Sequence, residues 1–201
     1  MISFIVSCII GFILGSIPSG LIVGKLISGI DIRKHGSKNI GTTNIFRTLG
    51  ARAAFIVLLA DSLKGVLSII IVSYIYPHNL LIAVSVGFTA FLGHNYSIFL
   101  GFKGGKGVAT ALGILLYFMP KLCLIIILIW LFVVLLTKYV SLASIIAAFC
   151  VPFLAWFMNY ERPLIFLGLF AAILVIIRHK SNISRLLNGT ESKIKKGNRS
   201  K

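Results

Sequence analysis

The sequence predicts an all-α polytopic membrane protein, a bundle of seven transmembrane helices with its N-terminus outside and its C-terminus in the cytoplasm. Hydrophobic residues make up 58% of the 201 residues and the mean hydropathy is +1.04, which leaves too little polar surface to cover a water-soluble globule. Apolar runs of membrane-spanning length recur along the chain, and basic residues gather between alternate runs. Composition therefore excludes a soluble domain.

Five apolar runs qualify as spans directly, because a helix needs roughly 20 mostly apolar residues to cross a bilayer. They are residues 2–24, 53–76, 79–102, 139–159 and 162–178. The first run resembles a signal peptide in position, but its first lysine, Lys25, follows it rather than precedes it. We therefore expect an uncleaved span.

Residues 107–137 are ambiguous, because Pro120 and Lys121 divide them into two short runs. Two short helices give seven spans, and one long helix gives six. With seven spans the inner segments 25–52, 103–106, Lys138 and 178–201 hold six, two, one and eight basic residues. Six spans would instead divide the basic residues evenly between the two faces. Since cytoplasmic segments collect Lys and Arg, and a lysine at a helix centre costs about 2.5–3.5 kcal/mol, we predict seven.

Residues 1–188 are expected to form a single transmembrane helical domain with its active site at the cytoplasmic face, followed by a basic cytoplasmic tail, 189–201. Cys8, Cys123 and Cys150 lie in apolar runs and are interpreted as small hydrophobic residues. Only four acidic side chains exist, and we expect none to cluster with a histidine. No metal, no cofactor and no nucleic-acid partner are therefore predicted.

The first inner loop, "DIRKHGSKNIGTTNIFRTLG" (residues 31–50), is dense in hydrogen-bond donors. Its candidates are Ser37, Asn39, Gly41, Thr42 and Arg47. "GTTN" is suited to begin a helix that runs on through Arg47, and such a helix start binds anions readily. The alternative is a solvated loop that merely obeys the positive-inside rule.

The second inner segment, "LGFKGGKGVATALG" (residues 100–113), fails the nucleotide P-loop pattern in its spacing. Gly104, Gly105 and Gly107 are nevertheless expected to present successive N–H groups as a concave nest, with a helix beginning near Val108. Lys103 and Lys106 would complete an anion cradle. A basic turn between helices is again the alternative.

The third segment, "IRHKSNISRLLNGTE" (residues 177–191), places His179 and Asn182 three residues apart, on one face of a helix. His179 could be a base, a donor, an anion ligand or an ordinary surface residue. Inside the second span, Asp61 and Lys64 lie at i and i+3, and we favour a structural pair over a catalytic role because intramembrane charges are costly. His94 and the polar stretch Ser141–Ser144 could reach the same pocket.

Six motifs in this chain resemble those of the bacterial acyl-phosphate:glycerol-3-phosphate acyltransferases, which are integral membrane enzymes. They are "GSIPSG", "DIRKHGSKNIGTTNIFRTLG", "ADSLKG", "GHNYSIFLGFKGGKGVATALG", "YVSLAS" and "IRHKSNISRLLNGTE". The likeness covers nearly the whole chain in order. It departs from the common pattern at Ser97, where the family often has Pro, and at Lys38, where Gly is common.

The resemblance implies transfer of an acyl group from acyl phosphate to the sn-1 hydroxyl of glycerol 3-phosphate, in bacterial phospholipid synthesis. It assigns essential roles to Ser37 and Arg47, phosphate binding to the loop 103–107, the reaction to His179 and Asn182, and a structural role to Glu191. The predicted partners are glycerol 3-phosphate, acyl phosphate and membrane lipid, and the predicted location is the bacterial cytoplasmic membrane.

The expected mechanism is direct transfer without an acyl-enzyme. Ser37, Ser144 and Asn182 would position the reactants, and Arg47 and Lys106 would stabilise developing charge. His179 or a substrate phosphate oxygen would accept the proton. Two alternatives remain: a transporter or channel for a phosphorylated solute, and a non-enzymatic lipid-binding membrane subunit. The sequence does not determine the oligomeric state.

Overall fold

The computed structural model describes residues 2–194, and those residues form helices joined by turns, with no strand among them. The predicted all-α class is thus confirmed. Residues 195–201 of the expected basic tail lie outside the described residues. The chain divides into two compact units, Met1–Phe118 and Met119–Lys201, which are described separately below.

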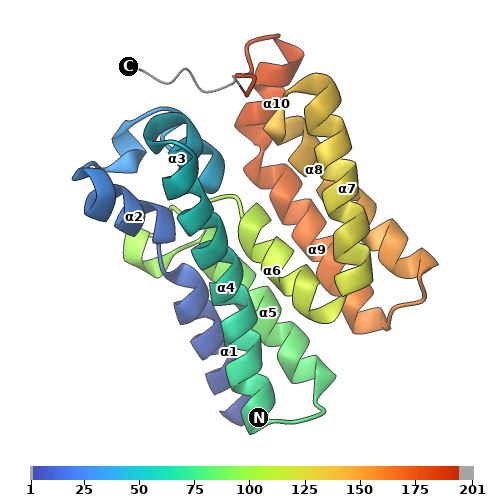
Figure 1. The fold of residues 1–201 in the computed structure, drawn as a ribbon. Coiled ribbons are helices and arrows are strands. Elements are labelled where there is room, and N and C mark those ends of the chain that lie inside the picture. Colours follow the sequence, from blue (N-terminus) through green and yellow to red (C-terminus); the bar gives the residue numbers. More distant parts are fainter. Residues whose placement is uncertain (1, 195–201) are drawn as a thin grey trace. The chain divides into compact units, whose positions relative to one another are not determined.

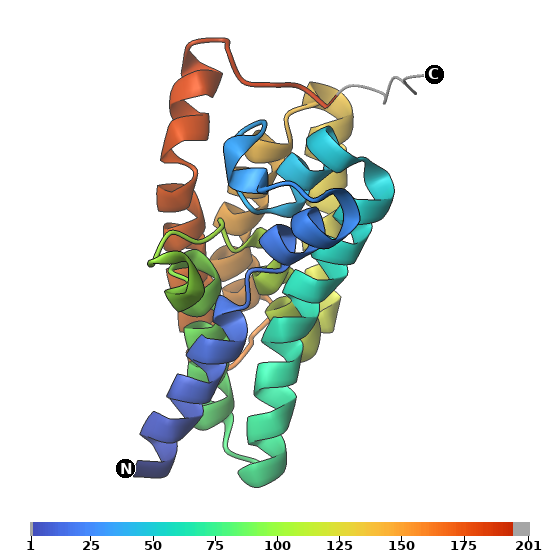
Figure 2. The ribbon, with the colours of Figure 1, turned by 90° about the vertical axis from the view of Figure 1, so that its left-hand side faces the viewer.

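The first unit contains six α-helices and two 3₁₀ turns. They are α1 (Ile2–Ser16), α2 (Ser19–Ser28), η1 (Ile32–Lys34), α3 (Thr42–Leu49), α4 (Ala51–Ile75), α5 (Leu80–Asn95), η2 (Ile98–Leu100) and α6 (Val108–Phe118). Within this unit α1 packs along α5 and against α4, and α4 also packs against α5 and α6 (Figures 1 and 2). A Cβ on Gly15 or Gly93 would overlap the backbone of the facing helix, so these glycines permit the close α1–α5 approach.

The first predicted span is broken rather than straight. α1 ends at Ser16 and α2 begins at Ser19, with Pro18 between them. Pro18 has no backbone N–H to continue the helical ladder, which accounts for the break. The carbonyl oxygen of Ile17, released at this break, accepts a hydrogen bond from the Lys64 side chain at 2.8 Å.

The described residues of the second unit, 119–194, form four helices: α7 (Pro120–Thr137), α8 (Val140–Phe157), α9 (Arg162–Arg178) and α10 (Lys180–Leu187). α8 packs against both α7 and α9 (Figure 1). α9 and α10 meet at His179 with a bend of 58°. Helical structure therefore continues beyond the last predicted span as α10, which runs in a different direction from α9.

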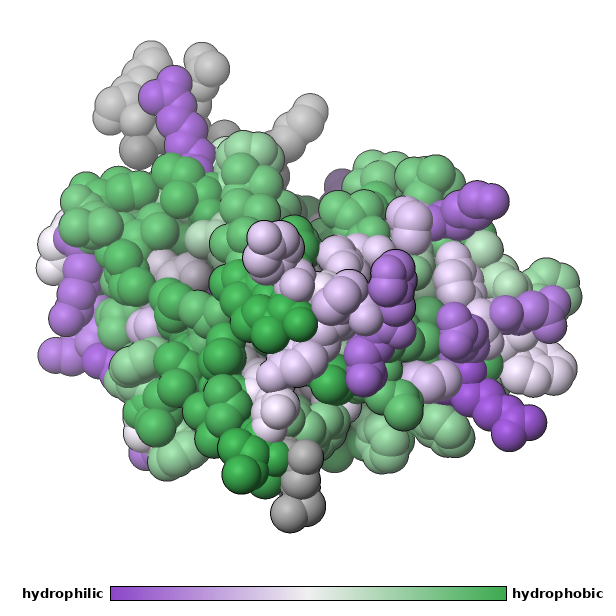
Figure 3. All heavy atoms as spheres, turned by 90° about the horizontal axis from the view of Figure 1, so that it is seen from below, coloured by the Kyte–Doolittle hydropathy of each residue, from purple (hydrophilic) through white to green (hydrophobic). Residues whose placement is uncertain are grey.

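Five helical segments of the described chain are long and apolar enough to cross a membrane, or six if α9 and α10 are counted as one bent span. α6 is shorter, with 11 residues, and is separated from α7 by Met119. The single long helix considered for residues 107–137 is therefore absent. Large apolar side chains stay exposed along these helices, as on α8 at Phe149, Phe153 and Trp156, and Figure 3 shows apolar residues over much of the face it draws. Lipid tails are the expected neighbours of such a surface.

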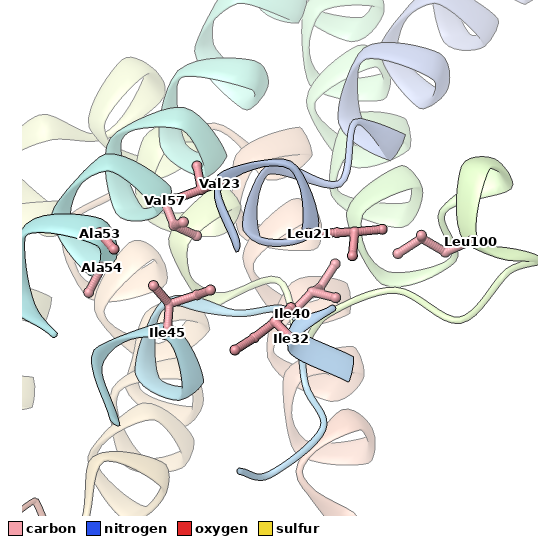
Figure 4. Packing of buried hydrophobic residues seen from close by; sticks show 9 residues of the cluster. All are labelled: Leu21, Val23, Ile32, Ile40, Ile45, Ala53, Ala54, Val57 and Leu100. Atoms are coloured by element: carbon pink, nitrogen blue, oxygen red, sulfur yellow. The ribbon is translucent and has the colours of Figure 1, made fainter. Parts of the chain in front are cut away.

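A buried apolar cluster supports the polar loops of the first unit (Figure 4). Its members come from α2, η1, the loop before α3, α3, α4 and η2: Leu21, Val23, Ile32, Ile40, Ile45, Ala53, Ala54, Val57 and Leu100. Ile32, Ile40 and Ile45 belong to the first inner loop, and Leu100 opens the second inner segment. The two predicted phosphate-binding segments are therefore anchored on one core.

Candidate substrate-binding and catalytic residues

Asn44 organises the first inner loop. Its side chain is 2% exposed; Oδ1 accepts a hydrogen bond from the Ser37 N–H at 2.8 Å, and Nδ2 donates to the carbonyls of Asn39 at 2.8 Å and His35 at 3.1 Å. A Cβ on Gly36 would overlap Asn44 Oδ1, so the chain approaches this amide closely. The loop therefore folds around one buried amide and leaves Ser37 exposed. Sequence reasoning did not single out Asn44, although it closes the "GTTN" motif.

The helix predicted from "GTTN" is α3, and Gly41 is its N-cap. Asn39 Oδ1 accepts a hydrogen bond from the Gly41 N–H at 2.9 Å and so fixes the entry to the helix. Thr42 begins α3, and its hydroxyl is buried without a hydrogen-bond partner among the described residues. Arg47 lies in the last turn with its side chain exposed. The start of α3 is thus preformed, as an anion-binding helix N-terminus requires.

The two departures from the family pattern have clear backbone settings. Lys38 has a φ of +59°, in the left-handed region that favours glycine. Ser97 has a φ of −59°, which a proline could adopt, and its hydroxyl donates to the Ser16 carbonyl at 2.5 Å. Lys38 therefore holds a strained conformation, whereas Ser97 gains a hydrogen bond that proline would lack.

The expected nest of glycine N–H groups is wrong for Gly104 and Gly105. The Gly104 N–H donates to the Asn95 carbonyl at 3.1 Å, and the Gly105 N–H donates to the His94 carbonyl at 3.0 Å. These donors satisfy carbonyls at the end of α5 that no helical residue can reach. The two N–H groups hold the loop to α5 and are thus engaged within the protein.

The three glycines are needed for close packing. A Cβ on Gly104 would overlap the His94 carbonyl, one on Gly105 would overlap the His94 ring, and one on Gly107 would overlap the Phe91 ring. Gly107 also has a φ of +82°. Lys103, at one end of this loop, is exposed, and Lys106 is half-buried just before α6 begins at Val108. The loop thus packs closely against α5 and carries two lysines.

Asp61 and Lys64 form the ion pair that their spacing predicted, with 2.8 Å between Lys64 Nζ and Asp61 Oδ1. His94 Nδ1 lies 3.5 Å from the same carboxylate oxygen, so the expectation that no carboxylate clusters with a histidine is wrong for Asp61. All three side chains are almost fully buried, at 1%, 6% and 3% exposed. In the first unit this cluster therefore joins α4 to the end of α5, beneath the glycine-rich loop.

In the second unit, His179 lies at the bend between α9 and α10 and is buried, not a surface residue. Its Nδ1 lies 2.7 Å from the carbonyl oxygen of Val175. A carbonyl only accepts, so the hydrogen is assigned to Nδ1. In the neutral ring Nε2 is then the nitrogen that can accept a proton.

Glu191 collects the polar groups around Asn182. Oε1 accepts hydrogen bonds from Asn182 Nδ2 and from Ser141 Oγ, both at 2.8 Å, and Oε2 accepts from Arg185 Nε at 2.7 Å. Burial raises the pKa of Glu191, but these hydrogen bonds and the Arg185 charge together hold it below its usual range. Glu191, in the predicted tail, therefore contacts α8 through Ser141 and α10 through Asn182, and it holds Asn182 in place.

Ser144 is held by two local hydrogen bonds. Its hydroxyl donates to the Val140 carbonyl at 2.9 Å and accepts from Trp130 Nε1 at 3.1 Å. The single hydroxyl hydrogen is thus engaged within α8, so Ser144 would have to leave this bond to donate to a substrate. Trp130 was not among the candidates, because nothing local marks an apolar residue of α7 as a partner of α8.

The residues described, 2–194, contain no group of three or more His, Cys, Asp or Glu side chains placed to hold a metal ion. Positive groups dominate both loops of the first unit instead. The arrangement defines a class, an α-helical integral membrane protein whose polar loops carry hydrogen-bond donors and cations suited to phosphate groups.

The family model for glycerol-3-phosphate acyltransferase matches residues 5–189, and the chain belongs to this family, as its motifs predicted. It is 46% identical to the glycerol-3-phosphate acyltransferase of Fusobacterium nucleatum, over 96% of this chain and 99% of that protein. It is 44% identical to that of Bacillus subtilis, over 93% and 95%.

Two crystal structures of PlsY, an integral membrane glycerol 3-phosphate acyltransferase, share the fold. The glycerol 3-phosphate form matches with a TM-score of 0.90 and 38% identity, and the lysophosphatidic acid form with 0.88 and 37%. Each match covers 96% of both chains. The likeness therefore extends over nearly the whole chain in three dimensions.

Proposed function

We propose that this protein transfers an acyl group from acyl phosphate to the sn-1 hydroxyl of glycerol 3-phosphate, giving 1-acyl-glycerol 3-phosphate and inorganic phosphate. The observation that carries the proposal is the pair of solved relatives, whose forms are those of the acceptor and of the acylated product of one transfer. In the reaction the acceptor oxygen forms a bond to the acyl carbon, the bond from that carbon to the phosphate oxygen breaks, and the hydroxyl proton goes to a base.

The first unit supplies groups for binding phosphate. We assign catalytic roles to Ser37, Arg47 and Lys106, and substrate contacts to Asn39, Gly41, Thr42, Lys103 and Gly107. Support comes from the exposed Ser37, which Asn44 holds near the start of α3, from the exposed Arg47 in the last turn of that helix, and from the cations along the glycine loop. Gly104 and Gly105 contribute as the frame of that loop, since their N–H groups bond to α5. Arg47 and Lys106 would stabilise the charge that develops on the leaving phosphate.

The second unit supplies His179, Asn182 and Ser144. Either the Nε2 atom of His179 or a phosphate oxygen of the substrate accepts the proton from the hydroxyl. His179 is suited to this role because its Nδ1 hydrogen bonds to the Val175 carbonyl, which makes Nε2 the accepting nitrogen of the neutral ring. Acyl phosphate is a mixed anhydride with a good leaving group, so modest activation of the hydroxyl suffices. Asn182 and Ser144 would position the reactants, and Glu191 fixes Asn182.

The protein would work in the bacterial cytoplasmic membrane as one membrane domain, residues 1–188, with seven spans, its N-terminus outside and its active site facing the cytoplasm. Support comes from the concentration of basic residues in alternate connecting segments. The short helix α6 would be the extra span beyond the longer segments. Membrane lipid would surround the exposed apolar side chains.

A transporter or channel for a phosphorylated solute is not favoured, because the family and both solved relatives are acyltransferases. A non-enzymatic lipid-binding subunit is disfavoured for the same reason.

The test supplies purified protein with radiolabelled glycerol 3-phosphate and palmitoyl phosphate, and we expect labelled lysophosphatidate. No product from protein that is demonstrably folded would overturn the acyltransferase. Efficient use of palmitoyl-CoA in place of palmitoyl phosphate would overturn the donor. Lys106→Ala should lower kcat/KM about 10- to 100-fold, the usual effect of removing a hydrogen bond to a charged group. Lys121→Ala, an exposed lysine at the start of α7, is the matched control and should leave kcat/KM unchanged.

A further inference from the structure

The buried cluster of Asp61, Lys64 and His94 has no part in the reaction described above. Its position is nevertheless unusual, because three ionisable side chains share the interior of a membrane bundle. Apolar residues of similar size would usually be at least as stabilising as a buried ion pair. Stability alone therefore does not explain why these three residues are buried together. The geometry of the cluster suggests a different role.

His94 lies between the carboxylate and the glycine loop. Its Nδ1 is 3.5 Å from Asp61 Oδ1, while its Nε2 is the atom that a Cβ on Gly105 would overlap. The His94 carbonyl also accepts the Gly105 N–H at 3.0 Å. Both the backbone and the ring of His94 thus set the position of Gly105.

Lys64 links Asp61 to the break between α1 and α2. Lys64 Nζ lies 2.8 Å from the Asp61 carboxylate and donates a hydrogen bond, also of 2.8 Å, to the Ile17 carbonyl at the break between α1 and α2. Since Gly105 lies between the two lysines of the loop, any rotation of the His94 ring would shift the backbone that carries Lys103 and Lys106.

We propose that Asp61 and His94 are positioning residues that hold the loop 103–107 in the conformation that binds a substrate phosphate. Asp61 acts on the His94 ring, and the ring acts on Gly105. The inference rests on the proposed acyl transfer, because its readout is the KM of a phosphate-bearing substrate.

The test compares His94→Ala with the wild type in the palmitoyl phosphate assay, with folding followed by thermal unfolding in detergent. We expect the KM of palmitoyl phosphate or of glycerol 3-phosphate to rise about tenfold, with kcat changed less than about threefold. Asp61→Leu combined with Lys64→Met removes both charges together and should raise the same KM. Asp61→Asn with Lys64→Met keeps an oxygen beside His94 Nδ1 and should return the KM towards the wild-type value. These pairs, and His94→Gln, decide the question if His94→Ala does not fold.

A double-mutant cycle tests the contact between the ring and the loop. Gly105→Ala should raise the KM in the wild type but add little to His94→Ala, because the new methyl group would occupy the space of the lost ring. Gly104→Ala is the matched control. Its Cβ would overlap the backbone of His94 and Asn95, so His94→Ala should not relieve it.

The outcomes are separable. A folded wild type without activity would overturn the proposed acyl transfer and, with it, the positioning role that rests on it. With an active wild type, unchanged KM values in folded His94→Ala, or additive effects of His94→Ala and Gly105→Ala, would overturn the positioning role. A fall in kcat alone would overturn it as well.

Discussion

Asn44 is the residue whose replacement should most clearly separate loop order from catalysis. Its side chain makes three short hydrogen bonds in the first loop, with Ser37 at 2.8 Å, Asn39 at 2.8 Å and His35 at 3.1 Å. A typical hydrogen bond contributes about 0.5–1.5 kcal/mol net. Asn44→Ala should therefore destabilise the folded loop by about 2–4 kcal/mol.

The effect on function follows from the position of Ser37 and the start of α3. When the loop is ordered only part of the time, the apparent affinity for the substrate falls with the ordered fraction. We therefore expect the KM of glycerol 3-phosphate to rise at least about tenfold in Asn44→Ala. Asn44→Asp should be equally poor, since it keeps the acceptor for the Ser37 N–H but places negative oxygen against the carbonyls of His35 and Asn39.

The assay is steady-state kinetics with palmitoyl phosphate at saturation, together with limited proteolysis of the loop 31–50. Cleavage within this loop should increase in both variants while the helices stay protected. If Asn44→Ala retained the wild-type KM and the wild-type cleavage pattern, the reasoning that one buried amide organises this loop would be refuted.

Three further changes follow from single contacts. Lys38→Gly relieves a left-handed backbone at φ +59°. It should stabilise the protein by about 0.5–1 kcal/mol, once the entropy that glycine adds to the unfolded state is subtracted. Lys25→Gly, inside α2, should instead destabilise the protein by about 1 kcal/mol, and thermal unfolding compares the two variants. Glu191 has a lowered pKa, so its stabilisation is present above the ordinary pKa of 4.5 and is lost as pH falls through the folded value. Glu191→Gln should thus be less stable than wild type at pH 7, and the difference in stability should shrink as the pH falls below 4.5; a difference that stays constant with pH would contradict this. Trp130→Phe removes the donor to Ser144 and should lower kcat about 2- to 10-fold, while Trp156→Phe, on an exposed tryptophan, should not change it.

The sequence by itself determined the features that depend on neighbouring residues. Composition and run length indicate a membrane bundle, Pro120 separates α6 from α7, and the i, i+3 spacing pairs Asp61 with Lys64. The family could also be recognised from the sequence, because its motifs are short and continuous. Each of these follows from local geometry or local solvation, which a linear pattern carries.

Only the tertiary structure decided what the polar groups contact. Gly104 and Gly105 looked like donors for an anion, but their N–H groups bond to carbonyls at the end of α5. Glu191 accepts a hydrogen bond of 2.8 Å from Ser141, which lies far from it along the chain. His94, at the end of α5, lies beside Asp61 of α4. A buried N–H or carboxylate must find a partner, and which partner is near depends on how the helices pack rather than on spacing along the chain.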